Sequence, residues 1–192
     1  GIEGLDLLPS SLDLIDIQDE LIKIPTRGIF SQRPVSVLGE ALCEEMNNYD
    51  IVLIDCPPNL GLITQNGLIL SQYYLIPVIP DVLSTYGIPQ IISRIKRLEL
   101  ETGVKIQPLG VAVNRFRQQN RLHSNQVHLL QVNARKMGFG RVFSAIVPEA
   151  SRAASAMDYS LPVNSLHDKY GYDVPFKPYQ QLTREVLEIV IS

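Results

Sequence analysis

Apolar positions along the chain follow two alternating patterns. Short continuous runs of Ile, Val and Leu, typical of strands buried on both faces of a parallel sheet, are separated by longer stretches with the apolar spacing of amphipathic helices. The predicted strands cover residues 4–9, 49–56, 74–79, 109–113 and 142–147. The predicted helices cover residues 12–24, 35–47, 60–72, 88–102, a part of 118–137, 149–157 and 178–191. This alternation predicts an α/β fold with a mostly parallel, doubly wound sheet flanked by helices.

The composition agrees with one folded domain. The chain has 192 residues, of which 45% are hydrophobic and 19% are charged, so there is enough apolar material for a sizeable core. Because no repeat or linker interrupts the pattern, we expect residues 1–192 to form a single domain. No apolar run approaches the roughly 20 residues needed to cross a bilayer. Cys43 and Cys56 lack metal-ligand spacing, which indicates reduced thiols and a cytoplasmic protein.

Charge is distributed unevenly along the chain. Residues 1–101 carry fourteen acidic and six basic side chains, a balance of −8. From residue 102 to residue 157, Glu149 is the single acid among eight basic side chains, a balance of +7. A basic middle within an acidic protein indicates a surface that meets an anion, either phosphate or nucleic acid.

The strongest chemical candidate is Asp55, which ends the most apolar of the predicted strands. Pro57 and Pro58 follow it, and because proline lacks an N–H donor and has a fixed φ, they end the strand and stiffen the loop. In an open parallel sheet, ligands bind beyond the carboxyl ends of the strands. A carboxylate there is placed to hold a hydrated Mg²⁺ beside a nucleotide phosphate. Its position alone is equally compatible with an ordinary aspartate that caps the next turn.

The wider sequence narrows this choice. Residues 49–64, YDIVLIDCPPNLGLIT, closely resemble the Walker B segment of the ParA/MinD group of partition ATPases. The resemblance covers nearly the whole chain: it begins at GLDLLPSSLDL and continues through Asn66-Gly67, Pro77-Val78, Tyr86-Gly87, Val147-Pro148, Arg152 and Ala156. It implies a P-loop NTPase-like fold and an ATPase that partitions plasmids or chromosomes.

Two departures from the family pattern limit this expectation. The phosphate-binding signature K-G-G-V-G-K-T and the D-x-D-P-Q strand end are missing from these residues, and Ser155-Ala156 stands where the family usually has Glu-Ala. We therefore expect the chain to be the C-terminal part of an ATPase domain and to be inactive in ATP hydrolysis by itself. The alternative is a genuine loss of the loop, which would leave a degenerate, non-catalytic scaffold or DNA-binding module.

The resemblance also implies roles for individual residues, with ATP and Mg²⁺ as cofactors. Asp55 would hold Mg²⁺ through water, and Asn114 with the loop of Pro148 and Glu149 would hold adenine. Asn114 could instead bond its own backbone in a turn, and Pro148 could simply end a strand. Non-specific contacts to DNA phosphate are expected from five arginines: Arg152, Arg115, Arg117, Arg121 and Arg141.

The partners implied by the resemblance are a second copy of the protein on ATP binding, non-specific DNA and a ParB-like stimulating protein, which would make the protein nucleoid-associated. Glu185 and Glu188 on the last predicted helix oppose binding to an anionic membrane surface, so we expect no membrane partner. A MinD-like ATPase that positions another cargo is a further alternative.

Overall fold

The computed structural model describes residues 4–10, 14–24, 33–150, 167, 171–172 and 176–191, with only the backbone of Leu14 and Ile15. The chain divides between Gln72 and Tyr73 into two compact units, which are treated separately below. The expectation of a single domain stays a prediction. None of the described helices is long and apolar enough to cross a membrane.

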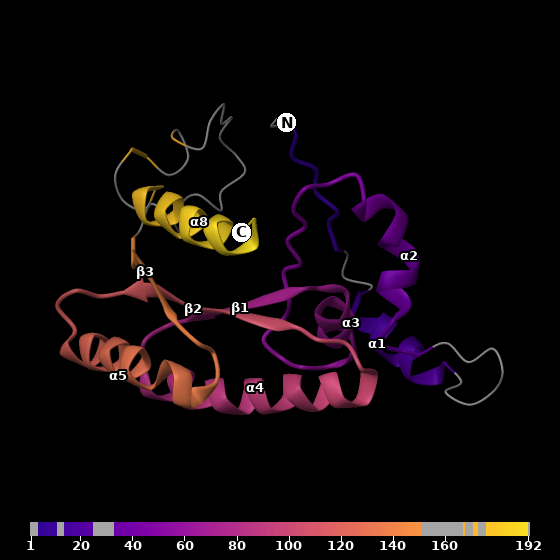
Figure 1. The fold of residues 1–192 in the computed structure, drawn as a ribbon, viewed down its shortest axis with the longest axis horizontal. Coiled ribbons are helices and arrows are strands. Elements are labelled where there is room, and N and C mark those ends of the chain that lie inside the picture. Colours follow the sequence, from indigo (N-terminus) through magenta and orange to yellow (C-terminus); the bar gives the residue numbers. More distant parts are fainter. Residues whose placement is uncertain are drawn as a thin grey trace. The chain divides into compact units, whose positions relative to one another are not determined.

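The described part of the first unit contains three helices (Figure 1): α1 (Leu14–Lys23), α2 (Val37–Met46) and α3 (Leu62–Leu70). All three lie where the apolar spacing predicted helices. The apolar side chains at helical spacing in and just before α2 are half-buried: Val35, Leu38, Leu42 and Met46.

Asn66 and Gly67, two residues of the resemblance, hold this unit together. Asn66 is buried, its Oδ1 accepts from the backbone N–H of Leu38 at 3.0 Å, and its Nδ2 donates to the carbonyls of Pro34 at 2.8 Å and Leu62 at 2.9 Å. A Cβ on Gly67 would lie 3.1 Å from Cγ2 of Ile54 and 3.2 Å from Sγ of Cys56. The missing side chain therefore lets the segment before Pro57 pack closely against α3.

Two predicted strands are wrong. Residues 4–9 and 49–56 form no strand, and the side chains of Ile51, Val52 and Leu53 are 42%, 41% and 89% exposed. A strand exists only where a neighbouring backbone supplies hydrogen bonds, and no described residue pairs with either segment. The apolar side chains of residues 51–53 thus have the composition of a buried strand, but they are exposed in this chain.

In the second unit, the described residues form a three-stranded sheet with helices on both faces. Its elements in chain order are β1 (Tyr73–Val78), α4 (Val82–Thr102), β2 (Gln107–Phe116), α5 (Arg121–Met137), β3 (Val142–Pro148) and α8 (Phe176–Val190). The described strands pair in the order β1-β2-β3, and both pairings are parallel. The predicted α/β class with a parallel, helix-flanked sheet is confirmed.

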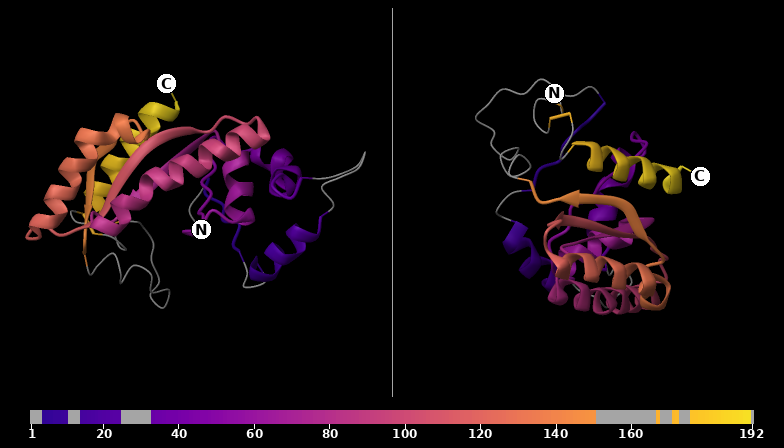
Figure 2. Two further views of the ribbon diagram at one scale, coloured as in Figure 1. Left: turned by 90° about the horizontal axis from the view of Figure 1, so that it is seen from below. Right: turned by 90° about the vertical axis from the view of Figure 1, so that its left-hand side faces the viewer.

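Helices α4 and α5 lie on one face of this sheet and α8 lies on the other (Figure 2), and each face has its own apolar layer. On one face, buried side chains of the strands pack with Ile88 and Ile92 of α4 and with Val127 and Leu130 of α5. On the other face, Leu109, Ala112 and Phe143 pack against the half-buried stripe of α8, which consists of Leu182, Val186, Ile189 and Val190. These two layers fix where the strands end and thus where polar side chains gather.

Helix α4 begins six residues before the predicted start at 88. The carboxylate of Asp81 caps it by accepting from the backbone N–H of Ser84 at 2.7 Å and from its hydroxyl at 2.8 Å. These bonds, the backbone one first, hold the pKa of Asp81 below its usual value. Gly87 and Pro89 have low helix propensity, so the sequence did not predict the first turns of this helix. The cap at Asp81 and the burial of Ile88 determine where the helix begins.

Strand β3 lies at the edge of the described sheet, and Glu185 of α8 caps that edge. Its carboxylate accepts from the backbone N–H groups of Ser144 and Ala145 at 2.7 and 2.9 Å and from the Ser144 hydroxyl at 2.6 Å. The pairing with β2 shifts register in this stretch, which frees consecutive N–H groups. Burial raises the pKa of Glu185, but these hydrogen bonds outweigh it and the pKa lies below its usual value.

The contacts of Asn66 give a stability prediction. In Asn66→Ala, the backbone groups of Leu38 and Pro34 lose their buried partner, so we expect the free energy of unfolding to fall by about 2 kcal/mol. Urea denaturation followed by circular dichroism measures this. The exposed Asn48 is the matched control, and Asn48→Ala should change stability by less than about 0.5 kcal/mol. Equal losses in the two variants would contradict the assigned role.

Candidate functional site

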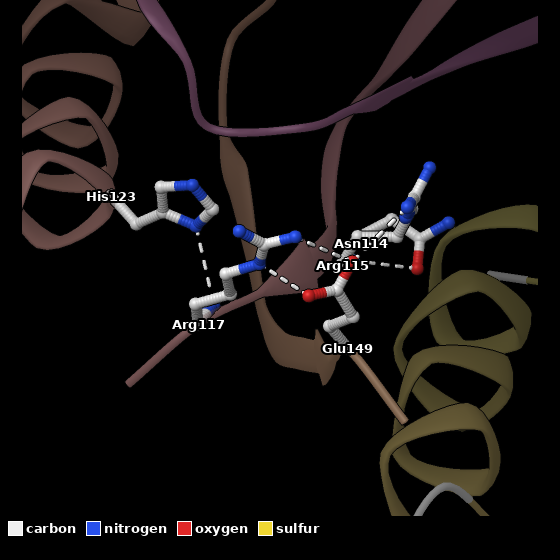
Figure 3. Close-up of polar contacts among 5 residues, drawn as sticks. All are labelled: Asn114, Arg115, Arg117, His123 and Glu149. Atoms are coloured by element: carbon white, nitrogen blue, oxygen red, sulfur yellow. Dashed lines mark hydrogen bonds and ion pairs between the residues drawn. The ribbon is translucent and has the colours of Figure 1, made fainter. Parts of the chain in front are cut away.

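Polar and charged side chains gather at the carboxyl edge of the sheet in the second unit. Asn114, Arg115 and Arg117 lie at or just beyond the end of β2, and Glu149 directly follows β3. Because the strands are parallel and Phe116 pairs with Pro148, these ends meet at one edge. Figure 3 shows the two arginines and Glu149 converging there. This is the edge at which open α/β sheets bind ligands.

Glu149 forms ion pairs with both arginines. Its Oε1 accepts from Nη2 of Arg115 at 3.0 Å and from Nη2 of Arg117 at 3.2 Å, while its Oε2 accepts from Nε of Arg117. Arg117 thus holds the carboxylate with two parallel N–H donors, a strong geometry for this pair of groups. The hydrogen bonds from Arg117 and then Arg115 lower the pKa of Glu149 to about 2.

The backbone around this cluster is fixed from three elements. The N–H of Glu149 donates to the carbonyl of Phe116 at 2.9 Å, which ties β3 to β2. The N–H of Arg117 donates to Nδ1 of His123 at 3.1 Å, which ties β2 to α5. His123 is buried and its ring centroid lies 6.0 Å from that of Phe116. Since Nδ1 accepts a hydrogen bond, the geometry assigns the neutral ring with its proton on Nε2.

Asn114 adopts the turn geometry that the sequence left open. Its Oδ1 accepts from the backbone N–H of Arg115 at 2.8 Å. Arg115 has a φ of 51°, the left-handed region that costs a side-chain-bearing residue about 1 kcal/mol. The Asn114 carboxamide thus supports a strained arginine, and its Nδ2 donors carry no bond to another described residue. The contact with adenine stays a prediction.

The five arginines predicted to contact DNA do not share one described surface. Arg115 and Arg117 lie at the carboxyl edge, as does Arg121, which is exposed in the first turn of α5 after the N-cap Asn120. Arg141 precedes β3 and lies at the amino edge, on the order of 20 Å along the strand from Pro148 at about 3.3 Å per residue. Arg152 lies outside the described residues.

Asp55 belongs to the first unit and is exposed. No hydrogen bond or ion pair in the described part of the chain engages its carboxylate, and no group of three metal-ligating side chains occurs there. A single accessible carboxylate fits Mg²⁺, which keeps several waters and takes few protein ligands. Burial, and then the charge of Asp55, raises the pKa of the neighbouring Cys56 thiol, so this cysteine stays a thiol at neutral pH.

Two residues of the carboxyl edge were not identified as candidates from the sequence. Asp81 could have been found, because an aspartate three positions before a serine and directly after a strand is a helix-cap signal. His123 has no such signal. Its role depends on the register between the end of β2 and the start of α5, which the spacing of apolar residues does not determine.

Solved structures of other proteins share the fold of this chain. Apo McdA from Cyanthece superimposes with a TM-score of 0.63 at 16% identity, over 95% of this chain and 81% of that one. Cobyrinic acid a,c-diamide synthase from Mycobacterium smegmatis, solved with a bound ATP analogue and magnesium, superimposes with a TM-score of 0.62 at 23% identity, over 75% of this chain and 55% of that one.

Sequence comparison defines the family. The profile of the AAA domain family matches residues 1–107. The chain is 27% identical over 190 residues to the chromosome-partitioning ATPase Soj of Treponema pallidum, and 24% identical over 162 residues to the sporulation initiation inhibitor protein Soj of Bacillus subtilis. The chain therefore belongs to the AAA domain family, and the predicted resemblance to ParA/MinD-type ATPases is confirmed.

These relatives are longer than this chain. The match takes in 97% of this chain and 68% of the Treponema protein, and 84% of this chain and 60% of the Bacillus protein. A ParA family protein of Mycoplasma pneumoniae, 27% identical over 197 residues, matches across 98% of this chain and 66% of its own length.

Acidification tests the ion pairs of Glu149. Because the pKa falls from 4.5 to about 2 in the folded protein, the pairs stabilise the fold above about pH 4.5, and this contribution is lost as the pH falls toward 2. We expect a ¹³C NMR titration to find the Glu149 carboxylate still ionised at about pH 3. In Arg117→Gln the titration midpoint should rise toward the ordinary value. A midpoint near 4.5 in the unmodified chain would rule out the pairing.

Proposed function

We propose that this chain is part of a ParA-like ATPase that partitions a plasmid or chromosome in the cytoplasm, with ATP-dependent dimerisation and non-specific binding to nucleoid DNA. The observation that carries the proposal is the Walker B-like segment, in which an accessible Asp55 follows an apolar run in a member of the ParA/MinD-type ATPases. A ParB-like protein would stimulate hydrolysis and so release the DNA.

The proposed cofactors are ATP and Mg²⁺. Support comes from the M. smegmatis synthase, solved with an ATP analogue and magnesium and also with ADP and magnesium. Bound Mg²⁺ neutralises negative charge on the phosphates. In this chain Asp55 would accept hydrogen bonds from waters around the ion, and Asn114 with Pro148 would contact adenine. The side chain of Glu149 is engaged by arginines, so any contact of this residue with adenine would come from its backbone carbonyl.

Binding to DNA is supported by the charge balance of +7 from residue 102 to residue 157 and by the exposed Arg121 near Arg115 and Arg117. Guanidinium groups bind phosphate oxygens with little regard to sequence. Arg121 is available for such a contact, because no described group forms an ion pair with it. Arg141 at the other edge of the sheet would belong to a separate contact.

ATP hydrolysis tests the magnesium role. We expect the longer protein that contains these residues to hydrolyse ATP with Mg²⁺, and Asp55→Asn to lower the rate by about 10- to 100-fold, because the waters around the ion lose a negatively charged acceptor. The exposed Asp19 on α1 is the matched control, and Asp19→Asn should leave the rate unchanged. The 192-residue chain alone should show no turnover. Magnesium-dependent turnover by this chain would refute that part of the proposal.

Salt-dependent DNA binding tests the nucleic-acid role. We expect fluorescence anisotropy to detect binding of the chain to a short DNA duplex, with affinity falling steeply between about 50 and about 200 mM salt. Arg121→Gln should reduce the slope of log affinity against log salt by about one, which corresponds to the loss of one phosphate contact. Arg94→Gln removes an exposed arginine of α4 and serves as the control. Retention on DNA that does not change with salt would count against an electrostatic mode.

Two alternatives make different predictions. A degenerate scaffold or DNA-binding module would bind DNA without ATPase activity, and a start codon directly before Gly1 would favour it. A MinD-like ATPase for another cargo would hydrolyse ATP without measurable affinity for DNA.

A further inference from the structure

The two arginines that meet Glu149 form a fork suited to an anion with several oxygens. Arg117 presents two parallel donors and Arg115 adds a third, so that three N–H groups from one end of β2 converge on one carboxylate. A phosphate group offers the same kind of acceptor oxygens as a carboxylate, and planar guanidinium groups bind both in this way. The donors that bind the Glu149 carboxylate are therefore of the kind that bind a phosphate group.

The chain maintains this arrangement with more than the ion pairs. Arg115 is the one non-glycine residue in the described chain with a positive φ, and Asn114 supports this backbone through its carboxamide. The backbones of Glu149 and Arg117 are each anchored by a hydrogen bond, to Phe116 and His123 respectively. Exposed ion pairs contribute little to stability, whereas strained backbone is typical of functional sites.

The sequence around the fork points in the same direction. Glu149 is the single acid from residue 102 to residue 157, and it lies between two of the eight bases of that stretch. Both arginine side chains are 59% exposed and the Glu149 side chain is 31% exposed, so a ligand in solution can reach the fork.

We propose that Arg115 and Arg117 form a phosphate-binding site and that Glu149 occupies it in the free protein, as an internal competitor that a phosphate of the DNA backbone displaces. This proposal rests on the proposed DNA binding and adds that Glu149 controls the affinity for DNA. Displacement exchanges one charge-assisted set of hydrogen bonds for another, with no covalent step. Because the carboxylate stays ionised at neutral pH, salt and phosphate concentration govern the exchange rather than pH.

The experiment compares two variants of the 192-residue chain that change the same charge. Glu149→Gln removes the competitor from the fork, and Glu101→Gln breaks the exposed Arg97–Glu101 pair on α4, which frees another arginine. Anisotropy with a labelled duplex of roughly 20 base pairs is recorded from about 50 to about 200 mM salt. Glu149→Gln should raise affinity about tenfold at about 100 mM salt and steepen the salt slope by one to two contacts, at roughly 0.9 per phosphate. Glu101→Gln should change affinity by less than about twofold.

A second comparison tests whether the change in DNA affinity comes from the two arginines of the fork or only from the change in net charge. Arg117→Gln should weaken binding by less than about twofold in the unmodified chain, where Glu149 already engages the arginine, but by about tenfold in the Glu149→Gln background. Equal effects of Arg117→Gln in both backgrounds, or equal gains from Glu149→Gln and Glu101→Gln, would overturn the proposal. If no variant binds DNA at about 50 mM salt, the proposed DNA-binding function itself fails, which is a different result.

The source of the phosphate has its own measurement. Inorganic phosphate and ATP are titrated separately while the Glu149 carboxyl and the Arg117 Nε signals are followed by NMR. If the duplex releases Glu149 at a lower concentration than inorganic phosphate or ATP does, the ligand is a nucleic acid. Release by ATP with unchanged DNA affinity in Glu149→Gln would assign the fork to a free nucleotide and overturn the proposal.

Discussion

The parallel pairing of β2 with β3 determines which side chains of the second unit can act together. Phe116 lies opposite Pro148, so the residues that follow each strand meet at the same edge. A slip of one residue in this register would turn Glu149 away from Arg115 and Arg117, because side chains alternate between faces. The apolar layers under α4, α5 and α8 hold that register. The polar cluster at the edge therefore depends on packing several residues away from it.

In the first unit, the candidate residue Asp55 is not positioned by strand pairing, because the Walker B-like segment around it has no regular secondary structure. Asp55 follows an apolar segment whose backbone has no strand partner among the described residues, and Leu53 is 89% exposed. What positions this segment is its contact with α3, where Gly67 permits the close approach of Ile54 and Cys56. In the proposed ATPase, the geometry at Asp55 would depend on backbone that pairs with this apolar segment, because a strand forms only where a neighbouring strand supplies hydrogen bonds.

Sequence patterns predicted most of the second unit, because its strands and helices are long enough for their apolar spacing to be distinct. They failed where a neighbour decides the outcome: residues 49–56 have the composition of a buried strand but no partner, and α4 begins at a cap ahead of Gly87 and Pro89. The candidate site was predicted only as a set of residue types. That Glu149 neutralises two of the arginines, and that Arg141 lies at the other edge, depends on pairing register and side-chain direction.

We propose that the carboxyl edge of β2 and β3 is the surface that meets nucleic-acid phosphate. A ¹⁵N–¹H NMR titration of the chain with a short DNA duplex tests it most directly, because each backbone amide reports its own surroundings. The account predicts that the amide signals of Arg115, Arg117, Arg121 and Glu149 shift together, while those of the amino edge, such as Val142, stay in place. Shifts confined to the amino edge around Arg141, with the carboxyl edge unchanged, would contradict it.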